Sequence, residues 1–169
     1  AEGVSVVGSL AYVADAWGGL QIIDISNPAN PTLRGAYDTL GYAEGVSVVG
    51  SLAYVADGDS GLQIIDVSNP ANPTRRGAYD TPGYAIGVSV VGSLAYVAAG
   101  SSLQIIDISN PANPFLRGAH NTQWAALDVN VVGSLAYTSW DWGLRIIDIS
   151  NPANPTLRGA HDTPGSARD

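Results

Sequence analysis

The sequence repeats one unit of about 42 residues four times. The pentapeptide NPANP marks the repeat and begins at Asn27, Asn69, Asn110 and Asn151. The segment VVGSLAY recurs in step with it, beginning at Val6, Val48, Val90 and Val131. The first two units differ at only six positions. A tandem period of this length is typical of solenoids, propellers and other arrays, so the fold must be built from four similar units.

Each unit contains four short β-strand patterns separated by turn residues. In the second unit they cover residues 45–49, 52–56, 62–68 and 74–80. The link Gly50-Ser51 is suited to a tight hairpin, because glycine accepts positive φ. The NPANP segment is predicted to be a loop, since its prolines remove ladder donors. Four antiparallel strands in this length predict an all-β fold in which each unit is one blade of a β-propeller.

The segments GLQIIDISNP, AYVAD and GAYDTPG resemble the LVIVD repeat, a bacterial propeller-forming repeat found often in cell-surface and secreted proteins. The resemblance extends over all four units. It implies propeller architecture and an extracytoplasmic setting. The family has no general activity, so the resemblance carries no catalytic residue onto this chain.

The repeat divides the chain into four predicted blades, which are residues 1–42, 43–84, 85–125 and 126–166, followed by a stub, 167–169. The first and last blades keep the apolar strands of the middle ones, although terminal repeats normally carry polar caps. We therefore expect two chains to meet head to tail as an eight-bladed homodimer. A four-bladed monomeric ring, a larger ring and an incomplete fragment are the alternatives.

Composition narrows the range of partners. The formal net charge is −8 and the chain has no lysine, which argues against binding nucleic acid or an anionic membrane surface. Cysteine is absent, so disulfides and thiolate metal sites are excluded. The near-identity of the units, the lack of Met and the start at Ala1 within the repeat pattern predict an excised or engineered fragment.

Among the connections between strands, the Gly-Ser turn and the NPANP loop are the same in all four units, and variation is confined to the other two links. One joins the second and third strands, and the other joins consecutive blades; in an up-and-down blade both emerge on the same side. All four tryptophans lie in these links, and the predicted ligand-binding residues are Trp17, Asp59, Trp124, Trp140, Asp141 and Trp142. Aromatic side chains on loops favour a carbohydrate or peptide ligand. The alternative is that these loops drifted after duplication and the tryptophans only pack between blades.

Two further residues are predicted to lie at the rim of the central channel, Glu2 and Glu44. The Asp57–Gly61 loop superficially resembles a calcium loop, but it lacks the later bidentate glutamate, and a polar turn is the better interpretation. The sequence predicts no metal site, no cofactor and no catalytic residue. The overall expectation is a non-enzymatic scaffold that assembles with itself.

Overall fold

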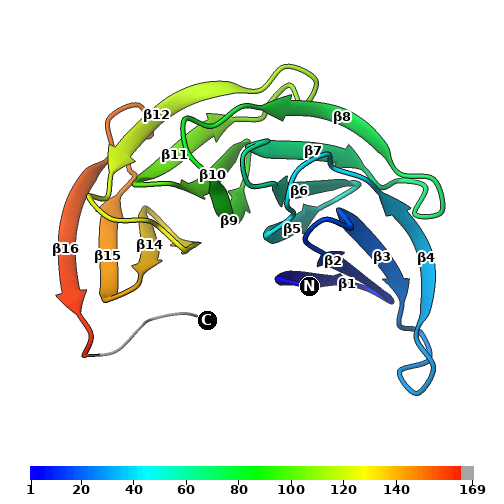
Figure 1. Cartoon of the computed structure of the whole chain (residues 1–169). Helices are drawn as coiled ribbons and strands as arrows, with labels where there is room; N and C mark the ends of the chain where they lie inside the picture. The colour runs from blue at the N-terminus through cyan, green and yellow to red at the C-terminus, as the bar shows by residue number, and fades with distance from the viewer. Residues whose placement is uncertain (165–169) are drawn as a thin grey trace.

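The computed structural model describes residues 1–164 and contains four antiparallel sheets of four strands each, which we call blades 1 to 4 (Figure 1). Blade 1 contains β1 (Gly3–Val7), β2 (Leu10–Ala14), β3 (Leu20–Asp24) and β4 (Thr32–Tyr37). Blade 2 contains β5 (Gly45–Val49), β6 (Leu52–Ala56), β7 (Leu62–Asp66) and β8 (Thr74–Tyr79). Blade 3 contains β9 (Ala85–Val91), β10 (Leu94–Ala99), β11 (Ser102–Asp107) and β12 (Phe115–Asn121). Blade 4 contains β13 (Asp128–Val132), β14 (Leu135–Trp140), β15 (Gly143–Asp148) and β16 (Thr156–Asp162).

Local chemistry explains the order of the strands within a blade. The first two strands join through the Gly-Ser turn, whose glycine has a φ of 59–61° in every blade, a conformation that favours glycine. In each NPANP loop the first asparagine accepts a hydrogen bond from the amide of the alanine two residues on, at 3.2–3.3 Å. The prediction of four four-stranded antiparallel blades is confirmed.

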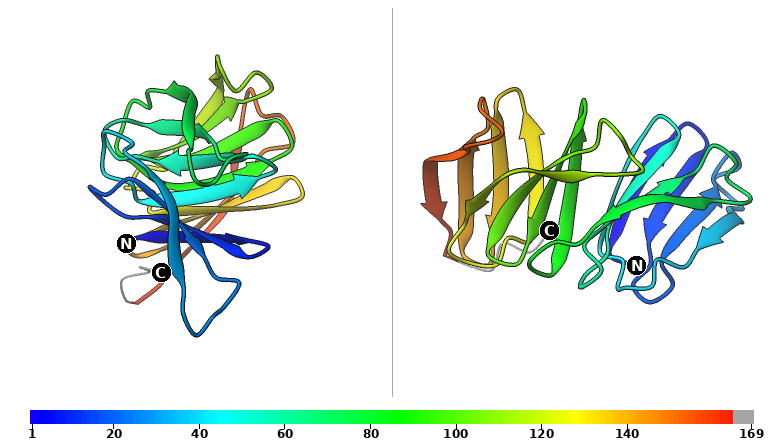
Figure 2. Two further views of the ribbon diagram at one scale, coloured as in Figure 1. Left: turned by 90° about the vertical axis from the view of Figure 1, so that its right-hand side faces the viewer. Right: turned by 90° about the horizontal axis from the view of Figure 1, so that it is seen from above.

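The four blades follow an arc around a common centre (Figures 1 and 2). The first strand of each blade lies innermost, and the fourth lies on the outer rim. The arc is open between blade 1 and blade 4, and the N-terminus lies on that open side (Figure 1). Within residues 1–164 there is no helix long and apolar enough to cross a membrane. The predicted stub, residues 167–169, lies outside the described part of the chain.

The hydrophobic core is divided into three layers, one between each pair of adjacent blades. Every blade therefore has two faces: we call the face toward the following blade its trailing face and the face toward the preceding blade its leading face, and in blades 2 and 3 both faces are packed. The layer between blades 2 and 3 joins Leu62 and Ile64 of a trailing face to Val97 and Ile106 of a leading face. Since side chains alternate along a strand, one strand supplies apolar residues to both layers.

The two variable links lie on one side of the arc, as the sequence predicts. Ala16, in the link between β2 and β3, forms a two-way backbone bridge with Ala43, at the start of blade 2. The invariant loops meet at the other side, where the amide of Ile25 donates to the carbonyl of Ser9 at 2.9 Å. Variation among the loops is therefore confined to one face of the disc.

Candidate functional site

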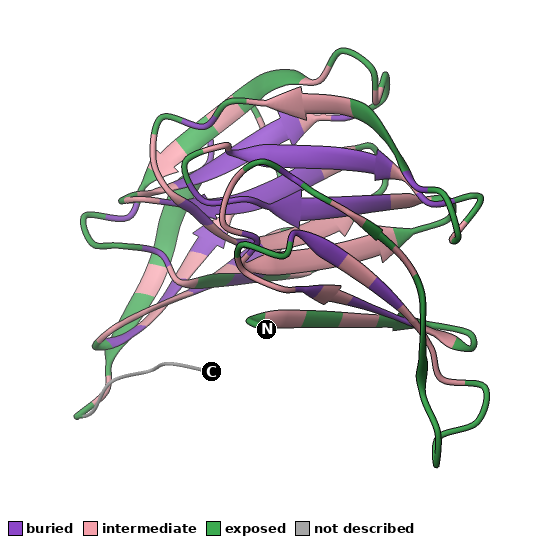
Figure 3. Ribbon diagram, turned by 45° about the vertical axis from the view of Figure 1, so that its right-hand side comes forward, coloured by how far each residue is buried: buried purple, intermediate pink, exposed green. Residues whose placement is uncertain are grey.

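The leading face of blade 1 has no blade in front of it among the described residues. Val4 and Val6 on β1 are 66% and 59% exposed. Ile23 on β3 is half-buried, whereas Ile65, Ile106 and Ile147 at the same register are 0% exposed. Figure 3 shows the consequence, since the innermost strand at the N-terminus alternates between exposed and intermediate residues while the middle blades are largely buried.

The trailing face of blade 4 is the matching free surface at the other end of the arc. Tyr137, Leu144 and Ile146 are only partly buried. Their equivalents in blades 1 to 3 are almost completely buried; these are Tyr12, Tyr54, Tyr96, Leu20, Leu62, Leu103, Ile22, Ile64 and Ile105. The two free faces thus carry the two halves of the interface that the chain forms three times internally.

A glycine on the fourth strand shows how closely adjacent blades approach. A Cβ added at Gly35, Gly77 or Gly118 would lie 2.1–2.2 Å from a proline carbonyl oxygen of the following blade. A Cβ added at Gly159, the equivalent in blade 4, meets no described atom within 4 Å. Blade 4 therefore keeps a glycine at this position although no described atom of the isolated arc would clash with a side chain there.

A second contact between the outer parts of adjacent blades is also made inside the arc and left without a partner at its two free ends. His120 Nδ1 lies 3.3 Å from the carbonyl oxygen of Pro155 in blade 4. His161 is the equivalent of His120 and is exposed, and Pro31 is the blade 1 equivalent of Pro155 and is also exposed. Each free face therefore carries one half of this polar contact too.

The tryptophans at the blade 4 end of the variable face form a stack. Trp124 and Trp140 lie nearly parallel, with ring centroids 5.7 Å apart. The guanidinium carbon of Arg145 lies 5.5 Å from the centroid of Trp140 on β14, a cation–π geometry. Trp124 is 56% exposed, so this stack presents aromatic surface to solvent, and Trp142, which is not part of the stack, is also 56% exposed.

The remaining predicted loop residues lie elsewhere on the arc. Trp17 in blade 1 is 78% exposed and makes an edge contact with Tyr42, at a centroid distance of 5.3 Å. Asp59 in blade 2 is exposed, and Asp141 in blade 4 is partly buried. The structure therefore brings together Trp124 and Trp140, while Trp17 and Asp59 lie on other blades.

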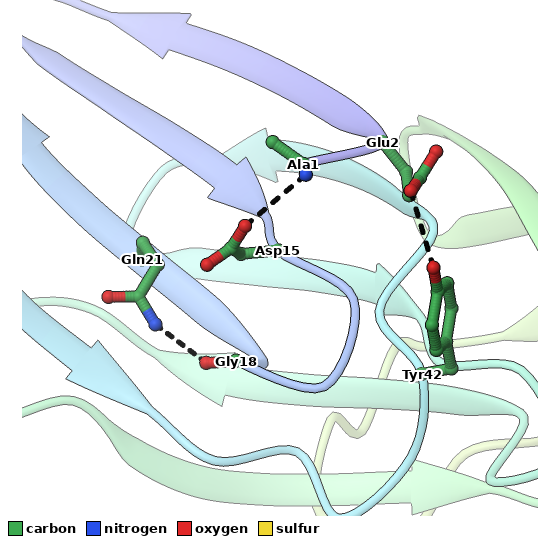
Figure 4. Close-up of polar contacts among 6 residues, drawn as sticks. All are labelled: Ala1, Glu2, Asp15, Gly18, Gln21 and Tyr42. Carbon is green, nitrogen blue, oxygen red and sulfur yellow. Dashed lines mark hydrogen bonds and ion pairs between the residues drawn. The ribbon is translucent and has the colours of Figure 1, made fainter.

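Glu2 and Glu44 line a concave pocket of about 540 Å³ along the innermost strands, together with Asp128. The hydroxyl of Tyr42 donates to Glu2 at 3.4 Å (Figure 4), and Tyr84 donates to Glu44 at 3.1 Å. Burial raises the pKa of the Glu44 carboxyl and repulsion from Glu2 adds to this, while the hydrogen bond from Tyr84 opposes it. Three carboxylates therefore give this pocket a negative character.

Blade 1 has its own polar contacts at its free end. The N-terminal ammonium group of Ala1 lies 3.3 Å from a carboxylate oxygen of Asp15 (Figure 4). Gln21 Nε2 donates to the carbonyl of Gly18 at 2.6 Å (Figure 4). Gln63 makes the same contact with Ser60 in blade 2 at 2.7 Å, so the link between second and third strands has a local hydrogen bond in addition to its backbone bridge to the next blade.

Asp57 is a buried carboxylate that the sequence did not reveal. It is 0% exposed, and Thr39 Oγ1 donates to its Oδ1 at 2.5 Å. Its Oδ2 atom is buried without a hydrogen-bond partner in the described residues. Burial raises the pKa of Asp57 to about 6, although the hydrogen bonds from Thr39 and the Gly41 amide lower it. The two carboxylates of the Asp57–Gly61 loop thus differ in burial, since Asp57 is buried and Asp59 is exposed.

Comparison with known proteins places these features in a family. The profile of the LVIVD repeat matches four consecutive segments, residues 1–39, 40–81, 82–122 and 125–163. A comparison with curated protein sequences found no match.

Several solved structures share the fold. The computationally designed Ika8 protein matches with a TM-score of 0.72 and 10% identity, over 96% of this chain and 50% of Ika8. The periplasmic gluconolactonase PpgL of Pseudomonas aeruginosa matches with a TM-score of 0.78 and 10% identity, over 96% and 57%. The β-propeller domain of Cps50 (Swd1) from Myceliophteria thermophila matches with a TM-score of 0.68 and 12% identity, over 94% and 57%. These likenesses show a β-propeller fold, and this chain spans about half the length of the three structures.

Proposed function

The chain belongs to the LVIVD-repeat family, and on that premise we propose that it is a non-enzymatic propeller scaffold that closes its ring by homodimerisation. Two copies related by a two-fold rotation place the trailing face of each blade 4 against the leading face of the other blade 1. The ring then has eight blades, which is within the usual range for propellers. The observation that carries this proposal is that the two free faces repeat both halves of the internal blade interface.

The apolar residues of these faces supply a driving force. Burying an exposed Val, Leu or Ile side chain stabilises by roughly 1.5–3 kcal/mol, and the half-buried ones gain about half as much. By the pattern of the internal interfaces, Ile23, Leu144 and Ile146 become buried when one such interface forms, and Val4 and Val6 become partly buried. The second interface of the ring closes within the same complex and has no further association cost, so a closed dimer is favoured over an open chain of subunits.

The comparisons support the same arrangement at the level of the fold. The chain covers only 57% of the Cps50 propeller domain and 50% of Ika8, although nearly all of its own length is matched. Four blades therefore correspond to part of the Cps50 propeller and of Ika8, whereas the chain covers 90% of the computationally designed Ika4 protein, at a TM-score of 0.71 and 9% identity. A second copy is the simplest source of the missing blades.

The mass in solution tests the proposal. We expect about 35 kDa by light scattering, twice the 17.4 kDa of one chain. Gly159→Val is expected to give a folded species of 17.4 kDa, because the new side chain has space in the isolated arc but collides with Pro28 of a second copy. Gly118→Val is the matched control, since it should disrupt the interface between blades 3 and 4 and lower the melting temperature. A 17.4 kDa wild-type species at all concentrations contradicts the proposal.

A second candidate function is supported by the tryptophans of the variable face. We propose that Trp124 and Trp142 bind a carbohydrate or peptide, because each is 56% exposed, Trp124 is held by its stack with Trp140, and exposed aromatic rings are suited to stacking on such ligands. The test is a glycan array and a peptide library screened with wild type and Trp142→Ala. Binding that disappears in the variant supports this function, and equal binding, or none by either protein, contradicts it.

A further inference from the structure

The innermost strand of blade 4, β13, carries larger side chains on its trailing face than the innermost strands of blades 1 to 3 do. In blades 1 to 3 this strand has a glycine and a serine at the register positions of Gly3 and Ser5; the pairs are Gly3 and Ser5, Gly45 and Ser47, and Gly87 and Ser89. At the same positions β13 has Asp128 and Asn130, and both are exposed. We call these two residues the β13 polar pair.

The internal interfaces show why the glycine matters. A Cβ added at Gly45 would lie 2.5 Å from the carbonyl oxygen of Ile86, and one added at Gly87 would lie 2.7 Å from the Cα of Asp128. Both neighbours are backbone atoms of the next blade, and ordinary contacts of a Cβ begin at 3.4 Å. The innermost strands of adjacent blades are therefore too close to admit any side chain at this position.

The same geometry places the β13 polar pair against the first strand of a second copy. Gly3 lies against the carbonyl oxygen of Glu44, which a Cβ on Gly3 would approach to 2.7 Å. Glu2 is the blade 1 equivalent of Glu44, so Asp128 would face the carbonyl group of Glu2 in the second copy. The Glu2 carboxylate lines the same pocket as Asp128. The volume and the charge of Asp128 both oppose close approach there.

We propose, on the premise of the eight-bladed dimer, that the β13 polar pair holds each closing interface wider at the channel than the three internal interfaces and so makes ring closure reversible. The outer parts of the closing interface, around Gly159 and Ile146, keep the features of the internal ones. The partner is a second copy of this chain, and the β13 polar pair sets how tightly it is bound.

The test restores the internal sequence at the closing interface. The double variant Asp128→Gly with Asn130→Ser is expected to lower the dimer dissociation constant at least about tenfold, a change of ~1.4 kcal/mol, measured by sedimentation or light scattering on dilution. Asp128→Asn removes the charge and keeps the volume, so we expect only a roughly threefold decrease, about the effect of one exposed charge contact. A double variant that binds no more tightly than wild type overturns the proposal.

A reverse substitution tests the same steric argument without dimerisation. Gly87→Asp with Ser89→Asn places the β13 polar pair at the interface between blades 3 and 4, and it should lower the melting temperature by at least about 5 °C. An unchanged melting temperature overturns the steric argument.

The outcomes separate the two proposals. A dimeric wild type with no gain in the double variant overturns only the role of the β13 polar pair. A monomeric wild type with a dimeric double variant supports that role and overturns spontaneous ring closure. Monomers in both cases overturn both proposals.

Discussion

The middle blades and the end blades are built from nearly the same residues but differ in burial. Ile64 in blade 2 is 0% exposed, whereas Ile146 at the same register in blade 4 is only half-buried. Val46 in blade 2 is half-buried, and Val4 in blade 1 is 66% exposed. In a repeat protein the burial of a residue is therefore decided by the neighbouring repeat. An apolar residue retained at a free end indicates that something covers that end.

The largest expected effect is on the free energy of unfolding, and it distinguishes a substitution in the core between two middle blades from one on a free end face. In the Gly159→Val background, which we expect to be monomeric, Ile64→Ala should lower the free energy of unfolding by about 3–4 kcal/mol because it leaves a cavity. Ile146→Ala should cost only about 1 kcal/mol there, since its side chain already contacts solvent. Urea denaturation of both variants measures the difference.

The same pair tests dimerisation in the wild-type background. Ile146→Ala should raise the dimer dissociation constant by roughly tenfold or more, since it removes buried apolar area from both closing interfaces. Equal losses of stability for the two variants in the monomeric background would contradict the distinction between middle and end blades.

The next effect concerns Asp57, which is buried between blades 1 and 2. Its pKa of about 6 lies above the ordinary value of 3.8, so the folded state prefers the protonated carboxyl. The protein is therefore most stable with respect to this group below about pH 4, and it loses this stability as the pH rises through 6. Asp57→Asn should remove that loss, a gain of roughly 2–3 kcal/mol at pH 7.5, while keeping an acceptor for the Thr39 hydroxyl.

Asp15 is the matched control in an end blade. It occupies the position of Asp57 in blade 1, but it is 44% exposed and its partner is the N-terminal ammonium group. Asp15→Asn therefore removes only an exposed ion pair, which contributes about 0.5 kcal/mol or less. Denaturation from pH 4 to 7.5 compares the two variants, and a flat profile for wild type would show that Asp57 is not a buried charge.

The repeat pattern allowed most of the fold to be predicted from the sequence. The NPANP prolines and Gly-Ser turns mark strand ends through local backbone chemistry, so the four-stranded blades and the variable face followed directly. The proposed dimer interface has a sequence signal as well, because Gly159 and Ile146 are kept without change from the internal repeats. Ring closure itself stays a prediction, since it depends on a second copy.

Contacts between distant links escaped the sequence analysis. The burial of Asp57 depends on Thr39, which belongs to the preceding blade link, and the Trp140 stack depends on Arg145 replacing the glutamine of the other blades. Neither pairing follows from spacing within one repeat. The exchange of glycine for Asp128 was visible in the sequence, but its meaning depends on the close approach of the innermost strands.

A smaller effect distinguishes the tryptophans at the two ends of the variable face. Trp140→Ala should lower the free energy of unfolding by about 2 kcal/mol, because it removes the stack with Trp124 and the contact with Arg145. Trp17→Ala should cost less than about 0.5 kcal/mol, since Trp17 is 78% exposed. Thermal or urea denaturation measures both. A large loss for Trp17 would instead assign it a packing role between blades.

The smallest expected effect is a change in melting temperature that should be the same in middle and end blades. It tests whether the difference between these blades is confined to the blade interfaces. Asp66 accepts hydrogen bonds from the amide and hydroxyl of Ser68 at 2.9 and 2.6 Å, and Asp148 does the same with Ser150 at 3.0 and 2.6 Å. The serine hydroxyl and amide lower the pKa of each carboxyl below its usual value. This contribution to stability is present at neutral pH and is lost as the pH falls through the lowered pKa. Asp66→Asn and Asp148→Asn should therefore each lower the melting temperature by a similar small amount, less than about 3 °C, and the difference from wild type should close in acid. Unequal effects at pH 7 would mean that the neighbouring blade also supports this loop, which would extend the contrast beyond the interfaces.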